Sequence, residues 1–106
     1  VLITVYNSTA EGGLADTPVI VHMDGVRKCV PAGTKIRLTP GESLTVTPYL
    51  YHDFHVETGS GDVLLGEVSM CNDDENDNRF YEETRRFPQI EEDEAPYRLL
   101  CTELSD

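Results

Sequence analysis

The chain has 106 residues, enough for one domain and too few for two, and 39% of them are apolar, which can build a hydrophobic core. Its formal net charge of −12 repels nucleic acid and anionic membrane surfaces, so neither is expected as a partner. No apolar run approaches the roughly 18 residues of a membrane span. Three widely separated cysteines do not suit a disulfide scaffold, and they favour a reducing cytoplasm.

Short β-rich runs, bounded by turn residues at intervals of about ten positions, predict an all-β sandwich or barrel. The Asp24-Gly25 pair predicts a hairpin, because both positions suit positive φ. Short strands or turns are expected again at Tyr97–Glu103. The expected strands are Val1–Tyr6, Val19–Met23, Val26–Val30, Lys35–Leu38, Ser43–Thr47, Asp53–Glu57 and Val63–Met70. Since the first strand begins at Val1 without a polar lead-in, we expect further residues before it in the intact protein. A processed mature N-terminus is the alternative.

His52 is the candidate metal ligand, and it follows a turn and a strand that begin at Gly41. A neutral imidazole is a common ligand of transition metals, although a histidine beside aromatic residues is more often a packed or surface side chain. His55 lies three positions further on. Because positions three apart in a strand face opposite sides, we expect His55 to point outward. His22 belongs to a separate strand and is expected to be structural.

The spacing around His52 resembles the second sequence motif of the cupins. In that motif a metal-binding histidine follows a glycine after eleven residues, with a proline between them, as in Gly41, Pro48 and His52. Leu50 stands where the family has a glycine, the proline is shifted by one position, and Val56 replaces the trailing asparagine. The resemblance implies a double-stranded β-helix, the jelly-roll-like cupin barrel.

A longer series of segments resembles the D-lyxose isomerases over nearly the whole chain. The segments are Leu2–Ser8, Asp24–Arg27, Pro31–Thr34, Pro40–Ser43, Leu50–His52, Gly66–Ser69, Asn72–Asp74, Asp77–Phe80, Arg86–Phe87 and Ile90–Glu94. This resemblance implies an aldose–ketose isomerase that interconverts D-lyxose and D-xylulose, with mannose and fructose as a further pair. By analogy with other cupins, a homodimer is expected.

The resemblance also implies a metal site. The family is similar to other cupin isomerases in using three histidines and one glutamate for a divalent cation, usually manganese. Two of those histidines and the glutamate come from a His-x-His…Glu motif that the family places just before the strand beginning at Val1. No His-x-His occurs in this chain, so His52 is the ligand carried over. Residues 1–106 are therefore expected to form one cupin domain that lacks an upstream segment and is nearly inactive alone.

Aldose–ketose exchange requires a base for a carbon-bound proton and a cation to stabilise charge on oxygen. The resemblance points to a glutamate after the Asn78-Arg79-Phe80 segment, where Glu82 is the first choice and Glu67, on the preceding expected strand, the second. Each could equally be a solvated charge. Arg86 could hold sugar hydroxyls or could pair with the acidic run 91–94.

Other readings of the sequence remain open. The chain could be a non-catalytic cupin that binds a sugar or metabolite, or a β-sandwich interaction domain with an acidic surface. The acidic loop from Asn72 to Glu83 partly fits a calcium loop, but Asp77 stands where an EF-hand needs glycine. A loop whose Asn and Asp side chains bond their own backbone is the preferred interpretation.

Overall fold

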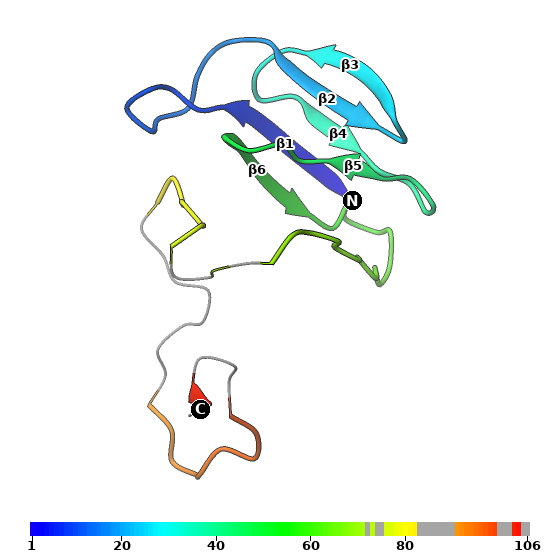
Figure 1. Ribbon diagram of the computed structural model, residues 1–106. Coiled ribbons are helices and arrows are strands. Elements are labelled where there is room, and N and C mark those ends of the chain that lie inside the picture. The colour runs from blue at the N-terminus through cyan, green and yellow to red at the C-terminus, as the bar shows by residue number, and fades with distance from the viewer. Residues whose placement is uncertain (72, 74–75, 83–90, 100–102, 105–106) are drawn as a thin grey trace.

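In the computed structural model, two antiparallel three-stranded sheets pack face to face (Figure 1). The structure describes residues 1–71, 73, 76–82, 91–99 and 103–104. One sheet has the strand order β4-β1-β6 and the other β3-β2-β5. The strands are β1 (Leu2–Asn7), β2 (Val19–Met23), β3 (Val26–Val30), β4 (Lys35–Arg37), β5 (Leu44–Thr45) and β6 (Leu50–His55). The all-β class is confirmed.

The hairpin between β2 and β3 forms where the sequence predicts it. Asp24 has φ of 49° and Gly25 has φ of 79°, which is the left-handed backbone that a two-residue hairpin turn requires. The Asp24 carboxylate also accepts hydrogen bonds from the backbone N–H and the hydroxyl of Ser43, at 2.9 and 3.0 Å. The same side chain therefore ties the hairpin to the chain just before β5.

The core lies between the two sheets. Val5 from β1 and Val19 and Val21 from β2 are fully buried, and Ile36 from β4 is 7% exposed. Alternate strand residues face opposite sides, so these positions mark the inner face of each sheet. A ring of half-buried apolar side chains packs around them, namely Ile3, Met23, Val30, Leu44 and Leu50. Removing this apolar surface from water holds the sheets together.

Two strand predictions need correction. The expected strand Val63–Met70 does not form, and its apolar side chains stay in solvent, with Leu64 98% and Val68 102% exposed. Apolar content alone predicts burial, but a strand also needs a neighbouring strand to satisfy its backbone groups. The strand expected at Asp53–Glu57 instead spans Leu50–His55, so His52 lies on a strand and not in a loop.

The sheets have open edges within the part of the chain that the structure describes. β6 borders one sheet and β3 the other, and no strand is shared between the two sheets. The closed cupin barrel therefore stays a prediction. Among the described residues, no helix is both long and apolar enough to cross a membrane. Cys29 and Cys71 are free thiols, as expected, while Cys101 lies outside the described residues.

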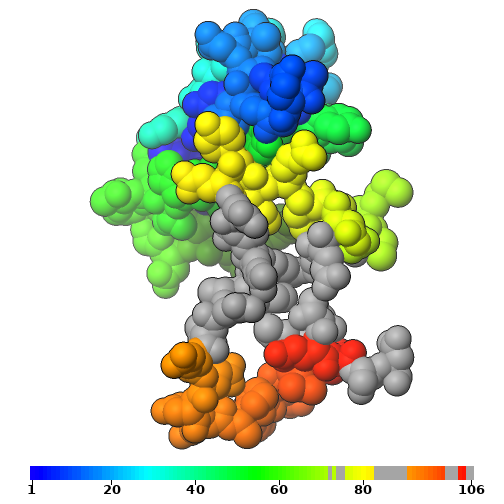
Figure 2. Space-filling view, turned by 90° about the vertical axis from the view of Figure 1, so that its left-hand side faces the viewer, coloured from blue at the N-terminus to red at the C-terminus, as the bar shows by residue number. Residues whose placement is uncertain are grey.

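The described C-terminal residues lie apart from the sheets. Residues 91–99 run as irregular chain below them (Figures 1 and 2). Tyr97–Leu99 form no strand, but the chain bends at Tyr97 and Arg98. The rest of the Tyr97–Glu103 prediction falls largely outside the described residues.

The buried position of Val21 yields a stability prediction. Val21→Thr keeps the size and β-branching of the side chain but buries a hydroxyl, which should lower the free energy of unfolding by about 1–3 kcal/mol. Urea unfolding of the intact protein measures this loss. Ile20→Thr, on the same strand but 42% exposed, is the matched control and should change stability by no more than about 0.5 kcal/mol. Equal losses in the two variants would contradict the assignment of the inner face.

Candidate functional site

The position of His52 follows from the pairing of β1 with β6. In this antiparallel ladder Val5 lies opposite His52, and Ile3 lies opposite Phe54. Residues directly opposite each other point to the same side of a sheet. Because Val5 is fully buried between the sheets, the His52 imidazole is on the core side of β6. It is exposed because β6 is an edge strand in the described structure.

The turn before β6 is fixed by the end of β1. Tyr49 has φ of 66°, which is uncommon for a side chain of this size. Its carbonyl accepts two hydrogen bonds from Ser8, one from the backbone N–H at 3.1 Å and one from the hydroxyl at 2.8 Å. These bonds hold the strained turn and start β6 at Leu50. The register of β6, and with it the side that His52 faces, is thereby specified at its first residue.

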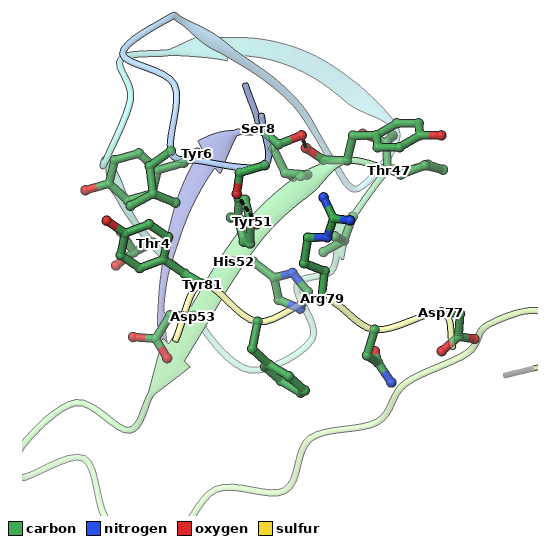
Figure 3. A pocket seen from close by; sticks show the side chains of 18 of the residues that line it. Thr4, Tyr6, Ser8, Thr47, Tyr51, His52, Asp53, Asp77, Arg79 and Tyr81 are labelled. Carbon is green, nitrogen blue, oxygen red and sulfur yellow. Dashed lines mark hydrogen bonds between the residues drawn. The ribbon is translucent and has the colours of Figure 1, made fainter. Parts of the chain in front are cut away.

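A broad hollow of about 1760 Å³ surrounds the edge of β6. Its size exceeds the roughly 300–1,000 Å³ of enclosed small-molecule pockets, so it is an open groove. Four segments contribute its walls: β1 with the following turn, residues 46–54, residues 67–70 and residues 76–81. Figure 3 shows the His52 ring projecting from β6 into this groove, with Arg79 beside it and Tyr81 on the side of Thr4 and Asp53.

The groove brings together some of the residues singled out in the sequence. His52 and Glu67 both line it, although they belong to segments that are 15 positions apart. Glu82 is exposed and follows Tyr81, the last residue of the wall. His55 lies opposite Leu2 and so faces away from the His52 side, which confirms the expected opposite orientation. Arg86 lies outside the described residues.

Among the described residues, His52 is the candidate metal ligand on the core side of β6, and the residues around it do not form a complete metal site. No group of three or more His, Cys, Asp or Glu side chains close enough to hold a metal ion occurs among them. An exposed imidazole that projects into a groove suits the role of a single ligand, because imidazole nitrogen is a common metal donor in proteins. The residues present therefore fit a contribution of one ligand to a shared metal site.

The described part of the acidic loop bonds to itself. The Asp77 carboxylate accepts a hydrogen bond from the Asp73 backbone N–H at 2.7 Å, and Asn76 donates its side-chain amide to the Asp73 carboxylate at 2.8 Å. The backbone N–H groups of Asn76 and Asp77 both bond the Asp73 carbonyl. These contacts match the preferred interpretation of the loop as a self-bonded turn.

Three residues of the groove were not predicted from the sequence as part of the site: Gly12, and Tyr51 and Arg79, which both contact it. The Tyr51 hydroxyl donates a hydrogen bond of 2.6 Å to the Gly12 carbonyl, and the guanidinium of Arg79 lies against the Cα of Gly12. The Gly12-Gly13 pair was a signal for an unusual turn at this point, and Gly12 does have φ of 84°. Nothing local in the sequence identifies Tyr51 or Arg79 as its partners.

Comparisons with known proteins place the chain in a family. The family model described as D-lyxose isomerase matches residues 1–104. A protein of Serratia proteamaculans named D-lyxose/D-mannose isomerase is 52% identical over 102 residues, and one of the same name from Escherichia coli O157:H7 is 43% identical over 102 residues. Each match covers 96% of this chain and 45% of the relative. The chain thus spans just under half the length of these relatives.

Proposed function

Because the chain belongs to the D-lyxose isomerase family, we propose that its protein interconverts D-lyxose and D-xylulose, and in a second activity mannose and fructose. Both relatives carry the name D-lyxose/D-mannose isomerase, which supports the two aldoses as substrates. The structural observation that carries the proposal is the inward-facing His52 imidazole in an open groove. Among the described residues that line the groove, Arg79 is the single arginine and no lysine occurs, which favours a free sugar over a sugar phosphate.

His52 is proposed to be one ligand of a divalent cation, with Mn²⁺ as the expected metal. The other ligands would come from the part of the family's length that this chain does not span. When bound, the cation would stabilise negative charge that develops on the sugar oxygens. The role of β6 is to hold the imidazole on the core side, where the cation and the sugar would meet.

The proposed reaction moves one proton from C2 of the aldose to C1 through a cis-enediol, while a second proton passes from O2 to O1. A carboxylate within reach of both carbons is suited to take and return the carbon-bound proton. Glu82 and Glu67 remain the two candidates, and the structure gives each a different advantage. Glu67 lines the groove with His52, whereas Glu82 directly follows the wall residue Tyr81. The homodimer and the cytoplasmic location stay predictions.

The two histidines of β6 provide a direct test of the ligand. His52→Ala should lower the metal content and the turnover of D-lyxose together. Loss of a residue that only hydrogen-bonds to a metal ligand typically lowers metal affinity about 10–100-fold, so loss of the ligand itself should lower it at least as much. Metal analysis alongside turnover measures both. His55→Ala removes the same ring from the opposite side of the strand and should change neither. Full metal content in His52→Ala would refute the assignment.

The two carboxylates can be distinguished by isosteric amides. Glu82→Gln should leave metal bound and lower kcat by about 10²–10⁴-fold, the usual contribution of a general base. Glu67→Gln serves as the parallel variant. If kcat falls only in Glu67→Gln, the base is Glu67, and if neither variant loses turnover, neither carboxylate is the base.

Removal of the metal distinguishes a metal-dependent isomerase from an interaction domain without catalytic activity. A chelator should abolish D-lyxose turnover by the intact protein, and added Mn²⁺ should restore it. Turnover that survives complete metal removal would contradict the metal-dependent mechanism. An intact protein that binds the sugar without turning it over would favour a binding module.

A further inference from the structure

Three segments that are distant in sequence meet at the Gly12 peptide. The first is the turn Thr9–Gly13 that follows β1, the second is Tyr51 on β6, and the third is Arg79 in the wall segment of residues 76–81. In the space-filling view the yellow atoms of this wall segment lie directly against the blue atoms of the N-terminal residues (Figure 2). The meeting point is therefore where the wall segment is attached to the sheet.

The turn Thr9–Gly13 is a rigid acceptor for these contacts. The Thr9 backbone N–H bonds the Gly13 carbonyl at 2.8 Å, and the Gly12 N–H bonds the Thr9 carbonyl at 3.0 Å. The Thr9 hydroxyl accepts a further bond from the Gly13 N–H at 2.8 Å. With these groups satisfied inside the turn, the Gly12 carbonyl is directed to the Tyr51 hydroxyl, 2.6 Å away.

The absence of a side chain at Gly12 lets Arg79 approach. A Cβ built at this position would lie 2.8 Å from Nη1 of Arg79, closer than such atoms approach each other. Two residues further along, the ring of Tyr81 meets the ring of Tyr51 edge to face, with centroids 6.4 Å apart and planes at 82°. This is a favourable aromatic geometry. The wall segment thus meets the sheet side at two points: Arg79 lies against Gly12, whose carbonyl the Tyr51 hydroxyl bonds, and Tyr81 packs on the Tyr51 ring.

We propose that Gly12, Tyr51 and Arg79 form a latch that fixes residues 76–81 across the edge of β6, and that Tyr51 is a positioning residue for sugar binding. The proposal rests on the proposed isomerase function, because it assigns the groove beside His52 to the sugar. Tyr51 and His52 are neighbours on opposite sides of β6. The same strand therefore carries both the proposed metal ligand and the residue that contacts the wall segment. Figure 3 shows the wall segment passing from Arg79, near His52, to Tyr81, near Thr4.

Trypsin offers a direct probe of the latch, because it cleaves after Arg79. In Tyr51→Phe the hydrogen bond to Gly12 is lost while the ring remains, so cleavage after Arg79 should be faster by about 2–10-fold, the change equivalent to one neutral hydrogen bond. Cleavage after the exposed Arg98 is the internal reference, and mass spectrometry of the intact protein's digest gives both rates. Equal rates after Arg79 in Tyr51→Phe and in the unsubstituted protein would overturn the latch.

Gly12→Ala is an independent variant with a matched control. It places a methyl group where Arg79 lies, and it should raise the cleavage after Arg79 as Tyr51→Phe does. Gly59→Ala imposes the same backbone strain, since its φ of 82° is close to the 84° of Gly12, but a Cβ there meets no atom within 4 Å. It should leave cleavage after Arg79 unchanged. Faster cleavage in Gly59→Ala to the same degree would attribute the effect to strain and overturn the latch.

Kinetics then separate positioning from support of the fold. Tyr51→Phe should raise KM for D-lyxose by about 2–10-fold with kcat and metal content nearly unchanged, because it removes binding that ground state and transition state share. An unchanged KM with faster cleavage would overturn the positioning role. If the unsubstituted protein does not turn over D-lyxose at all, the proposed function fails, while the cleavage rates still decide whether the latch exists.

Discussion

The antiparallel ladder between β1 and β6 is the constraint on which the site depends. Side chains alternate along a strand, so a slip of one residue in this ladder would turn every side chain of β6 to the other face. The pairing of Val5 with His52 places the imidazole on the core side, and the burial of Val5 makes that pairing energetically specific. Ser8, through its two hydrogen bonds to the Tyr49 carbonyl, sets the first residue of the strand.

Local signals in the sequence predict the parts of the fold that local chemistry determines. The strands Val19–Met23 and Val26–Val30 form as expected. The turn between them requires positive φ at two positions, and Asp24 and Gly25 both adopt it. The strand expected at Val63–Met70 does not form, because its formation depends on a non-local partner and not on local chemistry. A strand is stabilised by pairing with a neighbour, and the apolar composition of a segment carries no information about which neighbour is available.

The site could be predicted only where a motif carries its residues. The spacing from Gly41 to His52 led to the imidazole, and the ladder then supplied its orientation. Glu67 could be identified as a candidate, but its presence in the same groove as His52 depends on a chain path that the sequence does not specify. The contacts of Tyr51 with Gly12 and of Arg79 with Gly12 join positions 39 and 67 residues apart, and such separations leave no local pattern.

The edge position of β6 explains how one strand can serve both walls of the groove. An inner strand is flanked by neighbours on each side, and a following segment could reach only one face of it. At an edge, the chain can pass around the strand. Residues 76–81 do so, since they share the groove with Leu50 and His52 on one face and with Tyr51 and Asp53 on the other. Side chains therefore alternate in role along β6. Those on one face point to the core and the proposed metal, and those on the other face contact the wall segment.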